Sequence, residues 1–388
     1  MKVLGFLFTR NISLDVWVKT GMLERGKQIH ESEIEQNIYQ QIYWFTYGVN
    51  DKEIYDELIK TGRLNANIKV IPMPRIFKGR LGYDVYSILM PLIQKKYFKR
   101  LSLIRSNQMD GAWTGLVAKR LYGIPFYFRT GYTNTMFHEK MNGRRDWNFW
   151  KFAKLEKMLY KKCDLATVTS EHDKEYICDS YGIAKDKVQV LVNHIDTDRF
   201  YDMKLDNRRE RVVFVGRLSE QKNLFHTIEA VKNAGLGMDL FGRGDLQIQL
   251  REFAEKINAD IAFKGTVPND ELPQILNTYK YYILASDYEG MPKTLLEAMA
   301  CGNLCIGTKV EGIEEVIIDN ENGYLADGTS VSSIQDALER AMEDERYQEK
   351  IEKAEEMIRV KYSLQSVIRR ECELCAKLDM KSGCVEEK

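Results

Sequence analysis

The feature that most constrains this chain is an apolar run at residues 281–285 followed by a proline-led helical segment at 292–300. The run is bounded by turn residues and predicts a buried strand of a parallel sheet. Pro292 suits a first helical turn, and the residues that follow are good helix formers. A strand, a sharp turn and a helix with outward-facing N-terminal amides make a site for an anion. The segment therefore predicts an α/β fold with a ligand site at this turn.

Two carboxylates bracket the turn. Glu289 lies in the loop and Glu297 lies about two turns into the helix, with seven residues between them. This spacing allows both to reach one ligand, one near its reacting end and the other deeper. It also fits a helix start whose acidic first turn stabilises the helix dipole. The pair alone leaves both interpretations open.

Composition and length indicate a globular protein of more than one domain. The 388 residues suggest two or three domains, since a domain averages roughly 150 residues. A hydrophobic fraction of 44% with 21 Tyr, 16 Phe and 5 Trp excludes a disordered chain. The apolar start at residues 1–8 is too short for a signal peptide and predicts a strand. No stretch approaches the ~20 apolar residues of a membrane span.

The cysteines favour a reducing compartment. There are seven, an odd number, and they are scattered, which argues against a disulfide framework. Cys372 and Cys375 have CxxC spacing, but they lie in a charged helical run without a second pair, so no metal or redox chemistry is expected there. The cysteines therefore predict a cytoplasmic protein and indicate neither a metal site nor a redox cofactor.

The charge is balanced overall but unevenly placed. Residues 61–162 carry 21 basic and 5 acidic side chains, a net of +16, which suggests a negatively charged partner for the first domain. Two basic segments in this region, 89–105 and 147–162, have the amphipathic pattern of helices that lie on anionic bilayers. The pattern predicts peripheral contact with the inner membrane face. The alternative is that the apolar sides are core and the lysines are ordinary exposed charges.

The order of strands and helices divides the chain into two Rossmann-like halves. Alternating strands and helices predict a first α/β domain over residues 1–196 and a second over 205–363, joined by a polar, irregular linker. A continuous helical pattern is expected from residue 84 to residue 105. The first junction lacks the G-x-G-x-x-G of a dinucleotide-binding domain, so a nicotinamide or flavin cofactor is not expected.

Three turns of the second half are expected to converge. Ligands of an open parallel sheet bind outside the carboxyl ends of its strands, so Gly216, Gly242 and Glu289 should face one crevice. Arg217 and Lys222 then place two cations beside the predicted helix start. A diphosphate suits a bidentate arginine, a lysine and unbonded helix amides. Taken singly, each cation is also explained as a solvated loop charge.

Short motifs follow one another in a fixed order between about residues 160 and 370. They are Gly216-Arg217-Leu218, Gln221-Lys222-Asn223, Phe241-Gly242-x-Gly244, Phe263-x-Gly265-x-Val267, Glu289-Gly290-Met291-Pro292, Glu297-Ala298-Met299-Ala300-x-Gly302, Gly312-Ile313-x-Glu315 and residues 193–200. Together they closely resemble the motifs of the retaining glycosyltransferases of family 4. The resemblance implies the GT-B fold, in which two Rossmann-like domains face a central cleft.

The resemblance also implies a nucleotide-sugar donor, with a UDP-sugar favoured, bound by the C-terminal domain without a metal. Glu289, Arg217 and Lys222 would be catalytic, with Glu289 on the donor sugar and the cations on the diphosphate leaving group. Glu297 would bind the ribose and the Val267 backbone the base. The implied donor-binding residues are Gly216, Arg217, Lys222, Gly242, Val267, Glu289, Gly290, Met291, Pro292, Lys293, Thr294, Leu295 and Glu297.

The implied reaction is hexosyl transfer with retention to a hydroxyl of a glycan or a lipid-linked glycan, in the assembly of cell-surface polysaccharide or other glycans. The acceptor side would include Arg129, Tyr132 and His138, near the point where many family members carry a histidine. A helix at about 364–380 would cross back to the first domain, as in other GT-B proteins.

Two alternatives stay open at this level. One is another enzyme on the same fold, a nucleotide-sugar epimerase or a phosphorylase. The other is a non-catalytic module that binds carbohydrate or, through its basic region, nucleic acid. No nucleic-acid-binding motif is present, so nucleic acid is not an expected partner.

Overall fold

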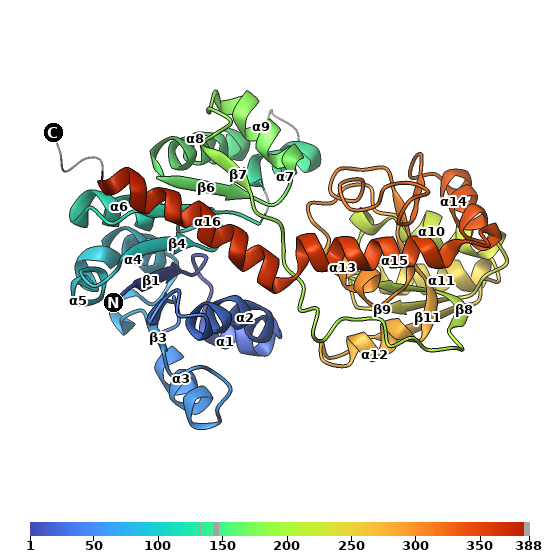
Figure 1. Ribbon diagram of the computed structural model, residues 1–388, viewed down its shortest axis with the longest axis horizontal. Helices are drawn as coiled ribbons and strands as arrows, with labels where there is room; N and C mark the ends of the chain where they lie inside the picture. The colour runs from blue at the N-terminus through green and yellow to red at the C-terminus, as the bar shows by residue number, and fades with distance from the viewer. Residues whose placement is uncertain (132, 143–146, 384–388) are drawn as a thin grey trace. The chain divides into compact units, whose positions relative to one another are not determined.

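The computed structural model describes residues 1–131, 133–142 and 147–383. They form two compact units: unit 1 is Met1–Leu191 together with the chain from Ile368 onward, and unit 2 is Val192–Val367. Each unit contains one parallel β-sheet with helices packed on it (Figure 1), which confirms the predicted fold class of two parallel-sheet α/β domains. The helix α16, Leu364–Gly383, begins in unit 2 and continues into unit 1.

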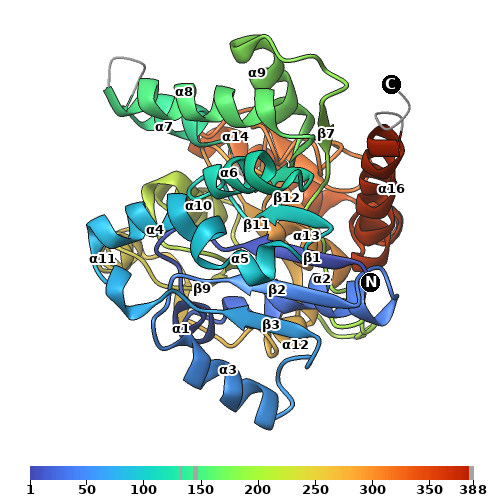
Figure 2. The same cartoon turned by 90° about the vertical axis from the view of Figure 1, so that its left-hand side faces the viewer.

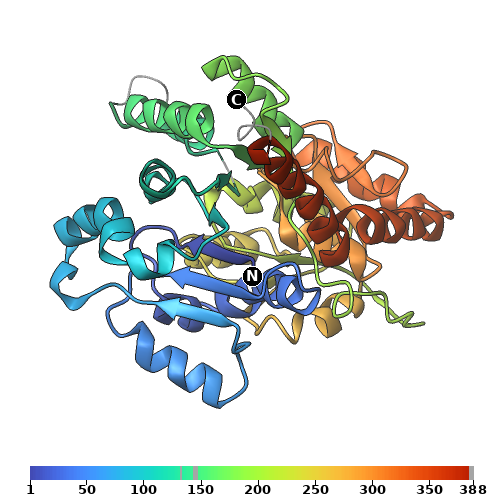
Figure 3. The same cartoon turned by 60° about the vertical axis from the view of Figure 1, so that its left-hand side comes forward.

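The described part of unit 1 has a seven-stranded sheet in the order β3-β2-β1-β4-β5-β6-β7, and all neighbouring strands are parallel. Figure 3 shows the blue strands β1–β3 side by side. The strands are β1 Val3–Leu7, β2 Gln41–Phe45, β3 Ile68–Ile71, β4 Leu103–Ser106, β5 Phe126–Arg129, β6 Leu165–Val168 and β7 Val188–Val190. The helices are α1 Leu14–Lys19, α2 Met22–Glu35, α3 Asp51–Lys60, η1 Arg75–Phe77, α4 Arg80–Ile93, α5 Lys95–Phe98, α6 Trp113–Tyr122, α7 Asn134–Asn142, α8 Trp147–Lys162 and α9 Glu171–Tyr181.

Two apolar cores lie on the two faces of this sheet, because its strands alternate their side chains between the faces. One core joins the sheet to α4, α5, α6, α8 and α9. The other joins it to α1, α2, α3 and the end of α16, through Leu374. Within the first layer α6 contacts both α4 and α8, and Figure 2 shows it between them.

The continuous helix predicted for residues 84–105 is wrong. Helix α4 ends at Ile93, the short helix α5 follows, and residues 103–106 form the central strand β4. The helical pattern of the apolar and basic residues up to Arg100 does not continue, and Arg105 is a residue type that is rarely buried in a central strand. In the structure Arg105 is 1% exposed and pairs with Glu33.

The sheet of unit 2 has six described strands in the order β10-β9-β8-β11-β12-β13, again all parallel. The strands are β8 Arg209–Val215, β9 Met238–Phe241, β10 Ile261–Gly265, β11 Tyr279–Leu284, β12 Leu304–Thr308 and β13 Tyr324–Ala326. The helices are η2 Glu220–Lys222, α10 Leu224–Asn233, α11 Gln247–Lys256, α12 Leu272–Asn277, α13 Lys293–Ala300, α14 Val331–Glu343, α15 Tyr347–Met357 and η3 Ile358–Tyr362.

The strand order of unit 2 reverses between β8 and β11. From β8 the chain builds outward through β9 and β10, and from β11 it builds the other way through β12 and β13. The loops that follow β8 and β11 therefore diverge at the same edge of the sheet, which is where open α/β sheets bind ligands. These are the loops that carry Arg217, Lys222 and Glu289.

Candidate active site

The two loops at the switch point are bonded to each other. The amide of Asp287 donates to the Gln221 carbonyl at 2.9 Å, and the Gln221 side-chain amide donates to the Tyr288 carbonyl at 2.8 Å. Gln221 thus holds the loop after β8 against the loop after β11. Sequence reasoning treated Gln221 only as part of a motif, because nothing in the sequence shows that its side chain crosses between loops.

Lys222 and Glu289 meet at this junction. The Lys222 ammonium and the Glu289 carboxylate form an ion pair, and the Ser286 hydroxyl donates to the same carboxylate oxygen, Oε1, at 2.7 Å. Glu289 is 8% exposed, so its position is determined by these partners rather than by solvent. Ser286 was missed by the sequence analysis. Its position two residues after the buried strand β11 was the available signal.

Arg217 supplies a second positive charge on the same loop as Lys222. It is exposed, and its side chain forms no ion pair or hydrogen bond within the described parts of the chain. Its guanidinium can therefore bind an anionic ligand without breaking an existing contact, whereas Lys222 already has one carboxylate partner. The structure thus brings two predicted cations and one predicted carboxylate to the same pair of loops.

Helix α13 begins immediately after the Glu289 loop. Pro292 is its N-cap and offers no side-chain hydrogen bond, and the positive end of the helix dipole lies at this point, which favours an anion. The alternative of an acidic first turn is wrong, because α13 has no acidic residue in that turn and Glu289 lies four residues before Lys293. Thr294, in this turn, accepts a hydrogen bond from the Tyr282 hydroxyl at 3.0 Å.

The second predicted carboxylate, Glu297, lies inside the unit and is 4% exposed. Its helix buries every residue from Leu295 to Ala300. The remaining donor-side residues lie at the same edge of the sheet: Gly290 and Met291 in the loop before α13, and Val267 just after β10. Met291 accepts a hydrogen bond from the Asn193 side chain at 3.2 Å.

Gly242 has a packing role that its sequence motif does not reveal. Its φ is +144°, and a Cβ there would lie 1.8 Å from the Gly216 carbonyl oxygen. Gly244 is similarly close to the Leu218 carbonyl, at 2.1 Å. The loops after β8 and β9 therefore pack backbone on backbone, which only glycine permits. Gly312, at φ +79°, packs on the Glu289 loop in the same way, since a Cβ there would lie 1.5 Å from the Gly290 carbonyl oxygen.

Replacing Gly242 with alanine is expected to lower the melting temperature of unit 2 by on the order of 5 °C and to weaken ligand binding there. The methyl group would push the Arg217 loop away from its place. Gly235→Ala is the matched control, since Gly235 also has a positive φ, +75°, but nothing lies within 4 Å of its Cβ position. Equal losses in the two variants would show that backbone strain, and not the clash with Gly216, is responsible. Differential scanning fluorimetry measures both.

The predicted acceptor-side residues lie in unit 1. Arg129 ends strand β5, and its guanidinium lies 3.7 Å from the Glu371 carboxylate. His138 is a half-buried residue of α7 whose ring centre lies 5.6 Å from that of Phe152. Tyr132 is outside the described residues. Arg129 and His138 thus lie against different neighbours, Glu371 and Phe152.

The sequence analysis missed a buried charge cluster of Arg105, Glu33 and Glu371. One Arg105 nitrogen lies 2.7 Å from Glu33 and 3.0 Å from Glu371, and all three residues are at most 2% exposed. Burial lowers the pKa of Arg105, but the two carboxylates raise it more, and it stays well above its usual range. The cluster attaches α16 to strand β4 and helix α2, and a sequence shows no sign of such a pairing across 266 positions.

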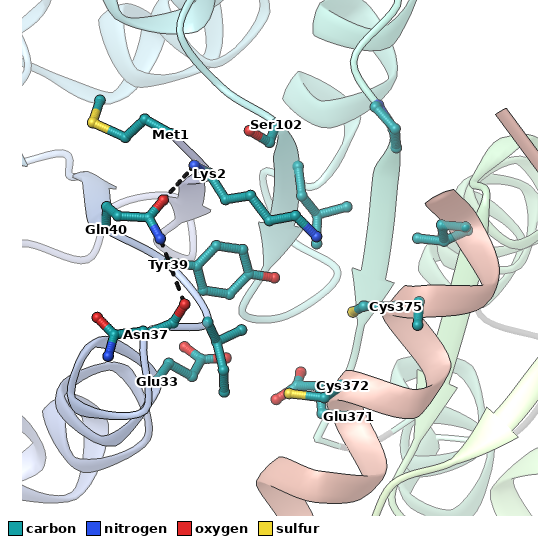
Figure 4. Close-up of a pocket in the computed structure, with 15 residues that line it drawn as sticks. Met1, Lys2, Glu33, Asn37, Tyr39, Gln40, Ser102, Glu371, Cys372 and Cys375 are labelled. Atoms are coloured by element: carbon teal, nitrogen blue, oxygen red, sulfur yellow. Dashed lines mark hydrogen bonds between the residues drawn. The ribbon is translucent and has the colours of Figure 1, made fainter. Parts of the chain in front are cut away.

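A cavity of about 630 Å³ lies beside this cluster (Figure 4). Glu371, Cys372 and Cys375 face it from α16, opposite Tyr39 and Glu33. Burial raises the pKa of Cys372 to about 11, so this thiol stays protonated at neutral pH. Among the described residues no group of three or more His, Cys, Asp or Glu could hold a metal ion, and no helix there is long and apolar enough to cross a membrane.

Sequence comparison finds two family models in adjacent positions. The glycosyltransferase family 4 model matches residues 40–199, and the model of glycosyl transferases group 1 matches residues 198–358. Together they span more than half of the chain, and their common boundary lies close to the start of unit 2 at Val192. All of the donor-side residues fall within the second match.

Individual relatives have low sequence identity to this chain, but the alignments with them are long. The chain is 26% identical over 230 residues to an uncharacterized glycosyltransferase of Methanocaldococcus jannaschii, an alignment covering 54% of this chain and 59% of that protein. It is 25% identical over 314 residues to the UDP-Gal:alpha-D-GlcNAc-diphosphoundecaprenol alpha-1,3-galactosyltransferase of Escherichia coli, covering 73% of this chain and 77% of that enzyme. Among solved structures, Anabaena HepE in complex with UDP and glucose has a TM-score of 0.73 at 15% identity, covering 97% of this chain and 100% of HepE. At that identity the likeness shows the fold alone.

Proposed function

Since the chain belongs to the GT-B glycosyltransferases matched by the family 4 and group 1 models, we propose that it is a retaining, hexosyltransferase-like enzyme. It moves a sugar from a nucleotide-sugar donor, favoured to be a UDP-sugar, to a hydroxyl of a glycan or lipid-linked glycan. The single observation that carries this proposal is the Lys222–Glu289 ion pair, held by Ser286 beside the exposed Arg217 at the start of α13. Cations for a diphosphate and a carboxylate for a sugar are thus adjacent.

The cations act on the leaving group. When the bond between the sugar and the phosphate breaks, negative charge grows on the diphosphate and the sugar ring becomes cation-like. Arg217, Lys222 and the N-terminal end of the α13 dipole place positive charge where that negative charge develops, which lowers the barrier without a bound metal. Because the loop contacts hold Lys222 in place, it needs little rearrangement during the reaction.

Glu289 acts on the donor sugar. Its carboxylate accepts hydrogen bonds from sugar hydroxyls and orients the ring over the diphosphate, while Ser286 and Lys222 keep that carboxylate in place. Retention follows if the acceptor approaches the same face that the diphosphate leaves. The acceptor oxygen then forms the new bond to the anomeric carbon, and the bond between that carbon and the diphosphate oxygen breaks. The departing diphosphate oxygen takes the acceptor's proton.

Two relatives support the substrate classes of this proposal. HepE has been solved with UDP and glucose, and the named substrate of the Escherichia coli relative is a sugar on diphosphoundecaprenol. We extend these to a UDP-sugar donor and a lipid-linked acceptor in cell-surface glycan assembly. A lipid-linked acceptor would require the enzyme to work at the cytoplasmic face of a membrane, in peripheral contact with its anionic lipids.

A nucleotide-sugar screen tests the proposal. The expected result is that one nucleotide sugar raises the melting temperature and is slowly hydrolysed by the enzyme, because binding to the folded state stabilises it by mass action. Adding acceptor glycans should then give a product with the donor's anomeric configuration. Isomerisation of the donor without an acceptor would instead indicate the epimerase, an alternative that the comparisons do not support. Binding without turnover of any donor would indicate a carbohydrate-binding module.

Replacing Lys222 with alanine is expected to weaken nucleotide binding and turnover together. Its charge faces the diphosphate both in the bound donor and during departure, so kcat and kcat/KM should each fall, by about tenfold to a hundredfold. Isothermal titration with UDP and initial-rate kinetics measure the two effects. Lys232→Ala, at the far end of α10, is a control that should change neither. Unchanged affinity for UDP in Lys222→Ala would exclude the proposed diphosphate contact.

A further inference from the structure

Helix α4 presents an apolar face to solvent. Its outward residues Leu81, Val85, Ile88 and Leu92 are 80%, 47%, 53% and 52% exposed, and Ile76 in the preceding turn is 85% exposed. Their spacing of three or four positions places the four helical residues in one row. Leu89 and Ile93, also exposed, widen this row.

The opposite face of α4 is fully used by the core of unit 1. Tyr86, Ser87, Met90 and Pro91 are buried there, and Tyr86 and Met90 belong to the core cluster. The outward face is therefore additional to the face that packs the fold. A helix that is apolar on both sides is normally covered on both, and an exposed apolar patch rimmed by polar residues marks an interaction surface.

Positive charge surrounds this face. Seven basic residues between positions 75 and 100 are all exposed: Arg75, Lys78, Arg80, Lys95, Lys96, Lys99 and Arg100. The same stretch contains a single acidic residue, Asp84, and that carboxylate is paired with Arg10. An apolar row with cations at both ends is complementary to a bilayer that has apolar chains beneath anionic headgroups.

We propose that this surface, η1 with α4 and α5, seats the protein on an anionic lipid bilayer. Leu81, Ile88 and Leu92 enter the boundary between headgroups and acyl chains, and the lysines after α4 lie among the phosphates. A second copy of the chain fits less well, because two copies of this surface would bring two sets of seven cations together. An acidic protein partner would also match the charge, but a surface for such a partner would not give the salt-resistant binding to phosphatidylglycerol vesicles expected in the test below.

Helix α8 contributes to the same helical layer. It and α4 both pack on α6, and its Trp147 and Trp150 are 72% and 60% exposed beside the exposed Lys151 and Lys154. The sequence predicted an amphipathic helix over residues 147–162, and in the structure the two tryptophans are exposed like the lysines. Aromatic and basic side chains together are typical of a membrane interface.

This inference builds on the proposed lipid-linked acceptor, yet its test needs no enzymatic activity. The full chain is sedimented with vesicles of phosphatidylglycerol or of phosphatidylcholine, at about 0.05 M and 0.5 M salt. Binding is expected to phosphatidylglycerol only, with a fraction that persists at high salt because the apolar row is inserted. The variant Leu81→Ser/Ile88→Ser/Leu92→Ser should lower the partition coefficient at least about tenfold and abolish the salt-resistant fraction.

Ile248→Ser is the matched control, since Ile248 is 71% exposed but lies on α11 of unit 2, and its binding should be unchanged. Circular dichroism confirms that the variants fold. Lys95→Glu/Lys96→Glu/Lys99→Glu should abolish binding at low salt. The inference is overturned if the chain binds neither vesicle or if the triple serine variant binds as the parent does. Absent vesicle binding together with a dimer that the serine variant dissociates would show that the surface joins two copies of the chain. Sugar transfer to a soluble acceptor tests the proposed function separately, and the serine variant should retain it.

Discussion

Replacing Glu289 with glutamine is expected to lower turnover by about a hundredfold or more while UDP binding persists. Glutamine keeps the size of the side chain but lacks the negative charge of the carboxylate. That carboxylate pairs with Lys222 and accepts a hydrogen bond from Ser286. If Glu289 stabilises the donor sugar mainly in the transition state, kcat and kcat/KM fall together and the affinity for the nucleotide changes little. Steady-state kinetics with the preferred donor and calorimetric titration with UDP measure these quantities.

Asp287 provides the control for this experiment. It is an exposed carboxylate two residues away in the same loop, so Asp287→Asn removes the same charge from the loop without touching the Lys222 contact. Its turnover should stay within about twofold of the parent enzyme. If Glu289→Gln retains near-normal turnover, Glu289 has no part in the mechanism. If both variants lose activity equally, the loop's overall charge matters and the position of the carboxylate does not.

Replacing Arg105 with methionine is expected to lower the free energy of unfolding of unit 1 by about 3–5 kcal/mol. The substitution leaves Glu33 and Glu371 buried, with Arg129 still 3.7 Å from Glu371. Uncompensated buried charge is among the most destabilising changes known in proteins. Because all five tryptophans lie before residue 151, their fluorescence during urea unfolding reports unit 1 specifically.

Arg370→Met is the matched control on the same helix. Arg370 is 47% exposed and pairs with Glu373 at 3.1 Å, and an exposed pair of this kind contributes only about 0–1 kcal/mol. A triple change of Arg105 to methionine with Glu33 and Glu371 to leucine should recover much of the stability lost by Arg105→Met, since no buried charge remains. If Arg105→Met unfolds at the same urea concentration as Arg370→Met, the cluster does not hold α16.

Where the local pattern of a segment agrees with its place in the tertiary structure, the sequence was sufficient to predict the element. The apolar run before Asp287 and the helix formers after Pro292 are β11 and α13 in the structure. The alternation of such units was enough to predict two parallel-sheet domains, because burial on both faces makes parallel strands continuously apolar. The convergence of Arg217, Lys222 and Glu289 also followed, because a parallel sheet places all its carboxyl ends at one edge.

Where an amino-acid type can be either buried or exposed, the sequence was not sufficient to predict its position. Arg105 in a basic run looks like a surface residue, but it lies in β4 with two buried carboxylates, one of them 266 positions away. The apolar residues of α4 look like core, yet most of them are exposed to solvent. Hydrophobicity and charge indicate the environment in which a side chain is stable. They do not identify the residue that it will contact.

The sequence by itself determined the fold class and the set of residues that meet at the β8–β11 edge, since both follow from periodicity and from the order of strands and turns along the chain. Only the tertiary structure decided how those residues are held: Gln221 joining two loops, Ser286 on the Glu289 carboxylate, and Gly242 under the Gly216 carbonyl. These contacts join segments up to 67 positions apart and depend on distances of a few ångströms. The pattern of residues in a chain determines which elements form, but distances of that size are determined only when those elements pack.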